Sequence, residues 1–453
     1  MGFTKDFVWG SATAAIQVEG AALEYGKGMD IWTTFSKKQG AVYQGHTPLI
    51  SCDQYHHLKE DVALMKEMGL QAYRFSISWS RVLPEGTGRI NEEGIAYYNR
   101  LIDLLLEHGI EPYITMYHWD LPEELQIKGG WVNPEIVAWF QEYAELLTER
   151  FSDRVKNWMT LNEPACFSGL GYLEGFHAPG LKVNTKEFFQ VVHHLLCAHG
   201  IAAKVLRKNA KQPVKISIAL NGGYYYPEKN CSKDIEAARR EMFSCKNDIH
   251  GDVWNIALLA DPIYLGTYPE DVLNCYKDVM PNFTKEDMEL ISQPLDFVCI
   301  NIYNGVMMKA DDHGNPVRVE RYEGFPKTAI QWPVTPECMY WAPKFLYERY
   351  HKPIIIAENG MSSHDWVCLD GKVHDNERTD FIHRYLLELK RAANDQIPIA
   401  GYFMWSFIDN FEWTEGYNER FGIVYVDYTT QNRVRKDSSY FYQETIKANG
   451  ENL

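Results

Sequence analysis

Two glutamates in this sequence directly follow short apolar runs. Glu358 comes after Pro353–Ala357, and Glu163 follows Asn162 at the end of the run Trp158–Leu161. If these runs are buried strands, each carboxylate needs partners, because desolvating an unpaired charge is costly. Two facing carboxyl groups can hydrolyse a glycoside, one protonating the leaving oxygen and the other attacking or assisting at the anomeric carbon. An aspartic-protease-like dyad or a two-metal site could use the same pair.

Polar and aromatic side chains follow other apolar runs in the same way. Simple packing gives no reason for this convergence, so we expect these residues to surround the two glutamates if the run ends meet in space. The residues in such positions are Arg74, His118, Trp119, Asp120, Asn162, Asn221, Asn301, Tyr303, Asn359 and Trp405.

Alternating apolar runs and amphipathic stretches indicate the elements that would position these side chains. The runs predict eight strands, at Phe7–Ala14, Gln71–Phe75, Glu111–Met116, Lys156–Leu161, Val214–Leu220, Asp296–Ile300, Pro353–Ala357 and Ile399–Met404. The intervening patterns predict helices at Gln54–Met68, Gly94–His108, Pro134–Phe151, Lys186–Asn209, Ile235–Leu259, Pro336–Tyr350 and Arg378–Asn394. Asn133 would cap the third helix, with Pro134 at its first position.

Eight βα repeats without a linker or a change of composition predict one α/β domain over residues 1–453, a (β/α)8 TIM barrel with elaborated βα loops. A doubly wound sheet is disfavoured because the glycine pairs Gly26/Gly28 and Gly169/Gly171 do not form the Gly-x-Gly-x-x-Gly turn. In a barrel the carboxyl ends of all strands meet at one face, where the active site is built.

Metal chemistry has little support in the sequence. His56, His57 and Glu60 lie on a predicted helix away from any strand end, and His193-His194 is interpreted as a pair on a helix face. We therefore predict neither a metal nor a cofactor.

Composition limits the partners. The 453 residues include 45 basic and 61 acidic side chains, a net charge of −16, which does not supply the basic surface that nucleic-acid binding needs. No run approaches the ~20 consecutive apolar residues of a membrane helix.

Nine cysteines without a Cys-x-x-Cys pair, and an N-terminus without a signal-peptide pattern, favour a cytoplasmic protein. The oligomeric state stays open, a homo-oligomer included.

Several motifs together closely resemble those of glycoside hydrolase family 1, the retaining β-glucosidases. They occur in the family's order between residues 7 and 428, which makes the set far more specific than any one motif. The matching segments are residues 16–20 (IQVEG), 73–79 (YRFSISW), 117–122 (YHWDLP), 160–164 (TLNEP), 356–360 (IAENG), 405–413 (WSFIDNFEW) and 420–427 (RFGIVYVD).

The resemblance implies that Glu358 is the nucleophile and Glu163 the general acid/base. A retaining pair lies about 5 Å apart, so the charge on Glu358 would raise the pKa of Glu163 and keep it protonated. Arg74 and Tyr303 would hold Glu358 ionised and oriented, and Asn162 would bind the sugar 2-hydroxyl. Asn301 is predicted to support catalysis together with these residues.

The resemblance also implies a sugar site. Its hydrogen-bonding residues would be Gln17, His118, Glu412 and Trp413, with Trp405 as a stacking platform and Phe421 nearby. Trp119, Asn221 and Trp332 complete the predicted substrate-binding set. The sequence departs from the family pattern mainly on the aglycone side, at Ala165 and at residues 332–336 (WPVTP), so the aglycone is left open.

Other members of the family act differently. The thioglucosidases replace the acid/base glutamate by glutamine, whereas this chain keeps Glu163. A 6-phospho-β-glucosidase, one alternative, needs a cradle for phosphate where this chain has Glu412 and Glu419. We therefore predict β-glucosides as substrates, with β-galactosides and β-fucosides as secondary ones. A non-catalytic sugar-binding barrel is the other alternative.

Overall fold

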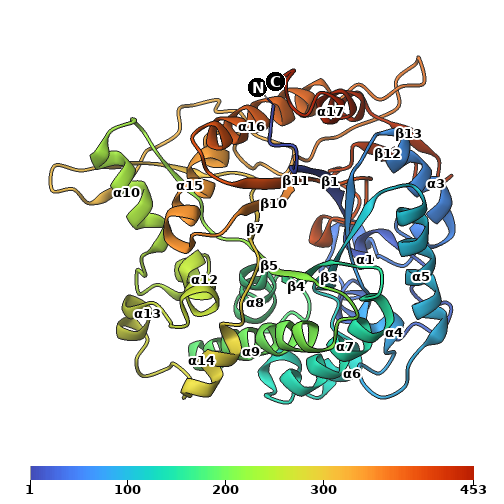
Figure 1. Cartoon of the computed structure of the whole chain (residues 1–453), viewed down its shortest axis with the longest axis horizontal. Helices are drawn as coiled ribbons and strands as arrows, with labels where there is room; N and C mark the ends of the chain where they lie inside the picture. Colours follow the sequence, from blue (N-terminus) through green and yellow to red (C-terminus); the bar gives the residue numbers. More distant parts are fainter. Residues whose placement is uncertain (1) are drawn as a thin grey trace.

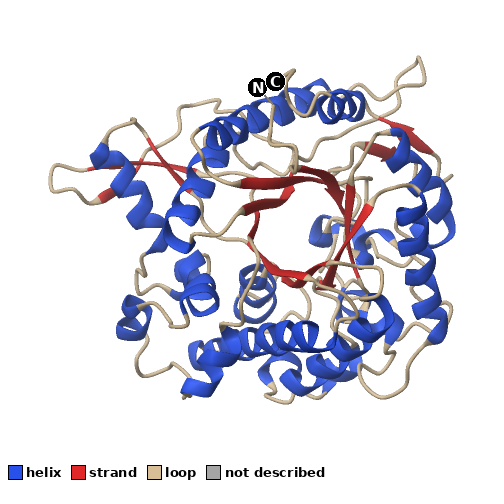
Figure 2. Ribbon diagram, in the orientation of Figure 1, coloured by secondary structure: helices blue, strands red, loops and turns tan. Residues whose placement is uncertain are grey.

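The computed structural model describes residues 2–453, and eight parallel strands form a closed barrel at its centre (Figure 2). Neighbouring strands follow the order β1-β11-β10-β7-β5-β4-β3-β2, and β2 pairs with β1 to close the ring. The strands are β1 (Val8–Ala12), β2 (Ala72–Ser76), β3 (Glu111–Tyr117), β4 (Asn157–Asn162), β5 (Lys215–Leu220), β7 (Val298–Asn301), β10 (Ile354–Asn359) and β11 (Ile399–Trp405). The predicted (β/α)8 barrel is confirmed, with strand bounds that differ by at most two residues.

Helices surround the barrel (Figures 1 and 2). The longer ones are α3 (Gln54–Glu67), α5 (Glu92–Glu107), α7 (Ile136–Phe151), α9 (Thr185–Asn209), α10 (Ser232–Phe243), α12 (Ile256–Leu265), α15 (Cys338–Tyr350), α16 (Asn376–Asn394) and α17 (Asp437–Lys447). Short helices are α1 (Ala15–Val18), α2 (Ile31–Phe35), α4 (Trp79–Val82), α6 (Glu123–Ile127), α8 (Pro164–Ser168), α11 (Ile249–Asp252), α13 (Glu270–Cys275) and α14 (Lys285–Ile291).

The remaining strands lie outside the barrel. A three-stranded sheet, ordered β6-β8-β9, projects to one side of the ring next to α10 (Figure 1), and a two-stranded ribbon joins β12 and β13. Their bounds are β6 (Tyr225–Pro227), β8 (Val306–Ala310), β9 (Pro316–Arg318), β12 (Val424–Val426) and β13 (Arg433–Arg435). The two ends of the chain lie close together near α17 (Figure 1).

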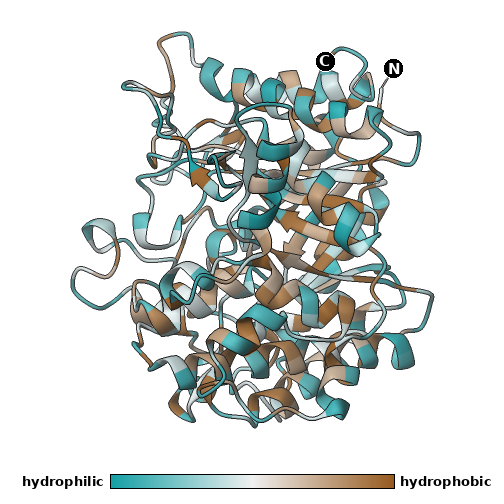
Figure 3. Cartoon of the chain, turned by 90° about the vertical axis from the view of Figure 1, so that its left-hand side faces the viewer, coloured by the Kyte–Doolittle hydropathy of each residue, from teal (hydrophilic) through white to brown (hydrophobic). Residues whose placement is uncertain are grey.

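Two cores follow from the alternation of side chains along the strands. In β10, Ile354 and Ile356 belong to the large core between strands and helices, while Ile355 and Ala357 belong to a smaller core formed largely by strand residues, which fills the barrel. The helices are amphipathic: in Figure 3 hydrophobic and hydrophilic colours alternate around them. This arrangement fixes which side of each strand can carry a site.

Helix α9 is long and apolar enough to span a membrane by length and composition, but 78% of its most apolar window is buried within the protein. It packs against α7 and α14. Its N-terminus carries a capping box in which the Asn184 side chain accepts from the Glu187 amide and Glu187 accepts from the Asn184 amide. The burial identifies α9 as a core helix of this fold.

Two helix predictions were wrong in detail. The predicted helix Ile235–Leu259 is three helices, α10, α11 and α12, because the buried Asp252 carboxylate accepts the amides of Lys246 and Asp248 and stabilises the break. Helix α7 begins at Ile136 rather than Pro134, since Asn133 forms a turn in which its side chain accepts the Glu135 amide.

Candidate active site

The two glutamates line one cavity of about 550 Å³ at the carboxyl ends of the strands. Glu163 directly follows β4, and Glu358 is the second-last residue of β10. Glu163 adopts a left-handed backbone conformation (φ 46°) and immediately precedes Pro164, the first residue of α8. A non-glycine residue in this region costs on the order of 1 kcal/mol, a strain typical of functional sites.

In both β10 and β4, a break in the alternation of inward and outward side chains turns a polar residue into this cavity: Glu358 in β10 and Asn162 in β4. In β10 the inward Ala357 is followed by Glu358, which also points inward, and the register with β7 shifts between Ile356 and Glu358. In β4 the register with β5 shifts between Met159 and Asn162. Without these irregularities the pleat would turn Glu358 and Asn162 toward the helices. Bulges of this kind re-aim side chains next to active sites.

Buried hydrogen bonds connect the two carboxylates. Arg74 donates from one nitrogen to Glu358 Oε1 (2.6 Å) and from the other to Asn162 Oδ1 (2.5 Å). Asn301 Nδ2 donates to Asn162 Oδ1 (3.0 Å) and to Glu163 Oε1 (2.7 Å). One continuous network therefore orients both glutamates. Tyr303, the fourth predicted supporting residue after Arg74, Asn162 and Asn301, donates from its hydroxyl to Glu358 Oε2 at 2.7 Å.

The environments of the two carboxyl groups differ. Burial, and next the charge of Glu358, raise the pKa of Glu163 to about 8. Burial also raises the pKa of Glu358, but the Arg74 cation and the Tyr303 hydroxyl oppose that rise. A proton shared by the pair therefore resides on Glu163. The predicted direction for Glu163 is borne out, with desolvation rather than the charge of Glu358 as the larger cause.

Unpaired polar atoms mark where a polar ligand would bind. Among residues 2–453, the buried atoms without a protein partner include Gln17 Oε1, His118 Nδ1, Asn221 Oδ1 and Asn301 Oδ1. Buried polar groups normally form hydrogen bonds, so several unpaired polar atoms in one region indicate a place where a ligand or water binds. His118, Asn221 and Asn301 line the cavity directly. Gln17 lies behind its wall and donates to the cavity residue Glu412 at 3.3 Å.

Aromatic rings form the remaining walls. Trp405 stacks on His118 with ring centroids 5.8 Å apart, and Trp119 packs on Trp413 at 4.3 Å. The Trp119 indole donates to the Asn162 carbonyl (2.9 Å), so it also fixes the strand end that carries Glu163. On the opposite side the predicted residues Tyr303, Trp332 and Phe421 form a cluster with centroids 5.2–6.1 Å apart.

The predicted site residues therefore assemble around one cavity, with Arg74 and Gln17 supporting it from behind. Sequence reasoning missed several lining residues because they lie beyond the ends of the barrel strands, in loops and in short helices. These are Cys166, Leu170, His177, Tyr224, Trp254, Asn304, Ile330, Thr414 and Glu415. Ala165 is buried in α8 and is not among the lining residues.

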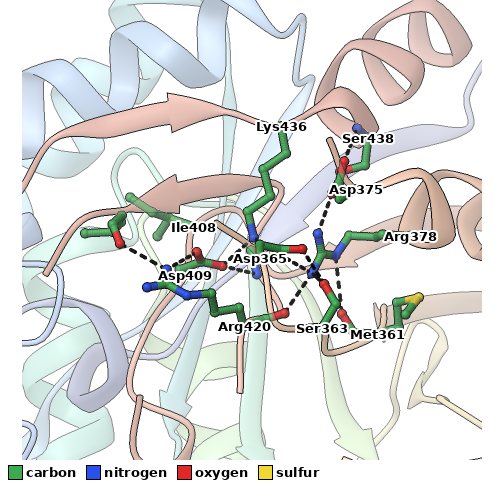
Figure 4. A network of polar contacts seen from close by, with 12 residues as sticks. Met361, Ser363, Asp365, Asp375, Arg378, Ile408, Asp409, Arg420, Lys436 and Ser438 are labelled. Carbon is green, nitrogen blue, oxygen red and sulfur yellow. Dashed lines mark hydrogen bonds and ion pairs between the residues drawn. The ribbon is translucent and has the colours of Figure 1, made fainter. Parts of the chain in front are cut away.

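A buried ionic network holds the loop that follows β11 (Figure 4). This loop presents Glu412, Trp413 and Phe421 to the cavity. Asp409 within it binds Lys436 (2.7 Å) and Arg420 (2.6 Å).

The same network reaches the loop after β10 (Figure 4). Lys436 also binds Asp365 (2.5 Å), and Arg378 binds Asp365 (2.8 Å) and Asp375. Because these groups are almost entirely buried, they fix the two loops relative to the C-terminal segment.

Acidic side chains crowd the part of the cavity around Glu412. Burial, and then the charges of Glu358, Glu419, Glu163 and Glu415, raise the pKa of Glu412 well above its usual value. Because negative charge is already unfavourable at this position, a phosphate group would be disfavoured there.

No set of three cavity residues within residues 2–453 has metal-ligand geometry. The group of His, Cys and Asp side chains close enough to share an ion lies elsewhere, at His193, Cys197 and Asp287. His56 and His57 bind neighbouring carboxylates on exposed α3 instead.

Comparisons with known proteins agree along the whole chain. The model of glycosyl hydrolase family 1 matches residues 1–451. Beta-glucosidase A of Thermotoga maritima is 47% identical over 451 residues, covering 99% of this chain and 98% of that protein. A 1,4-beta-D-glucan glucohydrolase of Thermotoga neapolitana is 48% identical and covers 99% of each chain. The solved Thermotoga maritima beta-glucosidase in complex with glucoimidazole superposes with a TM-score of 0.90 at 47% identity over 99% of both chains. The chain belongs to glycosyl hydrolase family 1.

Proposed function

We propose that this protein is a retaining β-glucosidase. It removes terminal non-reducing β-D-glucosyl residues from short oligosaccharides and aryl glucosides. The observation that carries the proposal is the pair Glu163 and Glu358 in one cavity, joined by the buried hydrogen bonds of Arg74, Asn162 and Asn301. The names of the relatives, beta-glucosidase and 1,4-beta-D-glucan glucohydrolase, support the glucoside as substrate.

In the first step the ionised Glu358 attacks the anomeric carbon while Glu163 gives its proton to the glycosidic oxygen. The bond from carbon to that oxygen breaks, the alcohol leaves, and a glycosyl ester of Glu358 remains. Because its pKa is raised to about 8, Glu163 is protonated at neutral pH and can donate this proton. Arg74 and Tyr303 hold the attacking carboxylate in one orientation.

In the second step the charge on Glu358 has been consumed by the ester, so one cause of the raised pKa of Glu163 is removed. Glu163 then takes a proton from water, and the resulting hydroxide equivalent attacks the anomeric carbon from the face that the alcohol left. The ester bond breaks, glucose of the β configuration is released, and Glu163 is again protonated.

The unpaired polar atoms of His118 and Asn221, which line the cavity, support recognition of sugar hydroxyls, and Trp405 offers a ring face to the sugar. Gln17 supports the site through its hydrogen bond to Glu412. The solved Thermotoga maritima relative in complex with deoxynojirimycin supports a sugar-shaped ligand. The carboxyl groups around Glu412 favour an unphosphorylated sugar over a 6-phosphoglucoside. β-Galactosides and β-fucosides are proposed as secondary substrates.

A rate comparison across aryl β-glucoside, β-galactoside, β-fucoside, 6-phosphoglucoside and cellobiose tests the proposal. We expect the glucoside and cellobiose to be hydrolysed and the phosphorylated sugar to be rejected. Binding of glucose without release of the chromophore from any aryl glycoside would instead support the sugar-binding barrel. A preference for the 6-phosphoglucoside would overturn the assignment of the sugar site.

A further inference from the structure

Three potential metal ligands meet on the outer layer of helices, apart from the active-site cavity. His193 and Cys197 lie one turn apart on α9, and Asp287 lies on the adjacent helix α14. One ligand atom from each of the three residues lies within 4.8 Å of the others. His193 Nε2 is 3.6 Å from Cys197 Sγ and 3.8 Å from Asp287 Oδ2.

His193 Nε2 and Cys197 Sγ form a weak sulfur hydrogen bond, whereas the separation of His193 and Asp287 suits a shared ion better than a direct contact. A distance of 3.8 Å is long for a hydrogen bond between imidazole and carboxylate. Zinc bonds of about 2.0–2.3 Å to nitrogen, oxygen and sulfur place tetrahedral ligand atoms about 3.3–3.6 Å apart. The His193–Cys197 separation matches the nitrogen–sulfur end of this range. The His193–Asp287 separation exceeds the nitrogen–oxygen value of about 3.3–3.5 Å by about 0.3–0.5 Å. A tetrahedral ion therefore fits once the partly exposed Asp287 side chain moves toward the other two ligands.

The surrounding residues orient two of these ligands. The other ring nitrogen of His193, Nδ1, lies 3.0 Å from the Tyr268 hydroxyl, which can hold the proton there and leave Nε2 free for a metal. Asp287 closes a capping box: its Oδ2 accepts the Thr284 amide at 2.8 Å. The carboxylate is thereby fixed at the start of α14. Second partners of this kind are typical of metal ligands.

Burial is also suited to a bound ion. His193 and Cys197 are buried, whereas the Asp287 side chain is 34% exposed and leaves a path from solvent. The rings of Tyr268 and Phe283 pack near the imidazole and shield it. Nitrogen, sulfur and oxygen donors in one set favour a borderline transition metal over Mg²⁺ or Ca²⁺, which prefer oxygen alone.

We propose that His193, Cys197 and Asp287 bind one Zn²⁺ ion, with water as the fourth ligand, and that the ion fastens α14 to α9. On binding, the Cys197 thiol loses its proton to solvent and the sulfur binds as the thiolate. The site supplies stability and takes no part in glycoside hydrolysis, because none of the three residues lines the active-site cavity.

The test uses the full-length protein freed of metal by dialysis against a chelator, with Co²⁺ as a spectroscopic probe and Zn²⁺ as competitor. We expect one Co²⁺ per chain with a thiolate-to-cobalt charge-transfer band, which Zn²⁺ abolishes. Cys197→Ser should remove the band. Cys231→Ser, which changes an exposed cysteine, is the matched control and should retain it. In the wild type and this control, but not in Cys197→Ser, Zn²⁺ should raise the melting temperature.

Asp287→Asn provides a second variant at a partly exposed position, and its side-chain oxygen can still accept the Thr284 amide of the capping box. We expect it to keep the charge-transfer band and to weaken Co²⁺ binding at least about tenfold, because a neutral amide is a poorer ligand than a carboxylate. The proposal is overturned if the wild type shows no thiolate band, if the band persists in Cys197→Ser, or if Asp287→Asn binds Co²⁺ with unchanged affinity.

Discussion

Arg74 and Glu358 form a 2.6 Å ion pair in which the arginine side chain is fully buried and the glutamate is 4% exposed. The pair joins the middle of β2 to the end of β10, two strands that are not neighbours in the barrel. A buried charge without its partner is costly, and the Arg74 cation favours the ionised form of Glu358 by opposing the rise of its pKa on burial. The same guanidinium also holds Asn162, next to Glu163.

Replacing Arg74 by methionine should lower kcat/KM by about 10²–10³, because a cation that supports charge at the reacting centre is removed. It should also raise the pKa of Glu358, which must be ionised to attack. The acid limb of the pH profile of kcat/KM should move to higher pH. Arg74→Lys keeps the charge but loses the fork that reaches both Glu358 and Asn162, and should recover part of the rate. An unmoved acid limb in Arg74→Met would contradict the pairing.

The wild-type activity should fall as the pH rises through about 8, since Glu163 must be protonated for the first step and its pKa is about 8. This limb should appear in kcat/KM, which reports on the free enzyme. Below it, activity should fall again where Glu358 gains a proton. Glu163→Gln should lose the basic limb, because its amide does not titrate. Persistence of that limb in Glu163→Gln would assign it to another group.

Glu163→Gln should also separate substrates by their leaving groups. Cellobiose releases a sugar alcohol that needs a proton, so its kcat should fall by about 10²–10⁴. A good phenolic leaving group departs without protonation, and its first step should suffer much less. The exposed substitution Glu145→Gln serves as the control and should change neither rate. An equal fall in kcat on both substrates would show that Glu163 is not the general acid.

Asp409→Asn should destabilise the protein and impair sugar binding together. The change leaves Arg420 without a charged partner and Lys436 with Asp365 alone in a buried network, at a cost of about 3–5 kcal/mol in the free energy of unfolding. The loop carrying Glu412 and Trp413 would loosen, so KM should rise. Urea unfolding and initial rates measure the two effects.

Asp380→Asn is the matched control, because it breaks an exposed ion pair with Arg384. Such surface pairs contribute about 0–1 kcal/mol, so neither stability nor KM should change appreciably. Asp409→Asn behaving like this control would show that the loop is positioned by other contacts.

The sequence predicts the barrel because the eight apolar runs are strongly patterned and closing them into a ring brings their ends together. It also points to Glu163 and Glu358, since carboxylates at strand ends stand out. It could not show the shifts in register before Asn162 and Glu358, because a two-residue alternation predicts the opposite orientation for both. Those shifts depend on pairing between strands that are distant in the sequence.

The misses in the helices and loops have a local and a long-range cause. The helix predicted over Ile235–Leu259 is interrupted in the polar segment 244–252 (SCKNDIHGD), where Asp252 accepts amides four and six residues before it. His177 and Trp254 reach the cavity from segments without a strand-end signal. Only the folded chain brings these side chains beside the glutamates.

The most direct test of the central claim is proton NMR of the first glucose released from an aryl β-glucoside, recorded before the anomers interconvert. If Glu358 attacks and water then displaces it from the same face that the alcohol left, the β-anomer must appear first. Initial release of the α-anomer would mean a single displacement by water. It would contradict the assignment of Glu358 as nucleophile and Glu163 as acid and base.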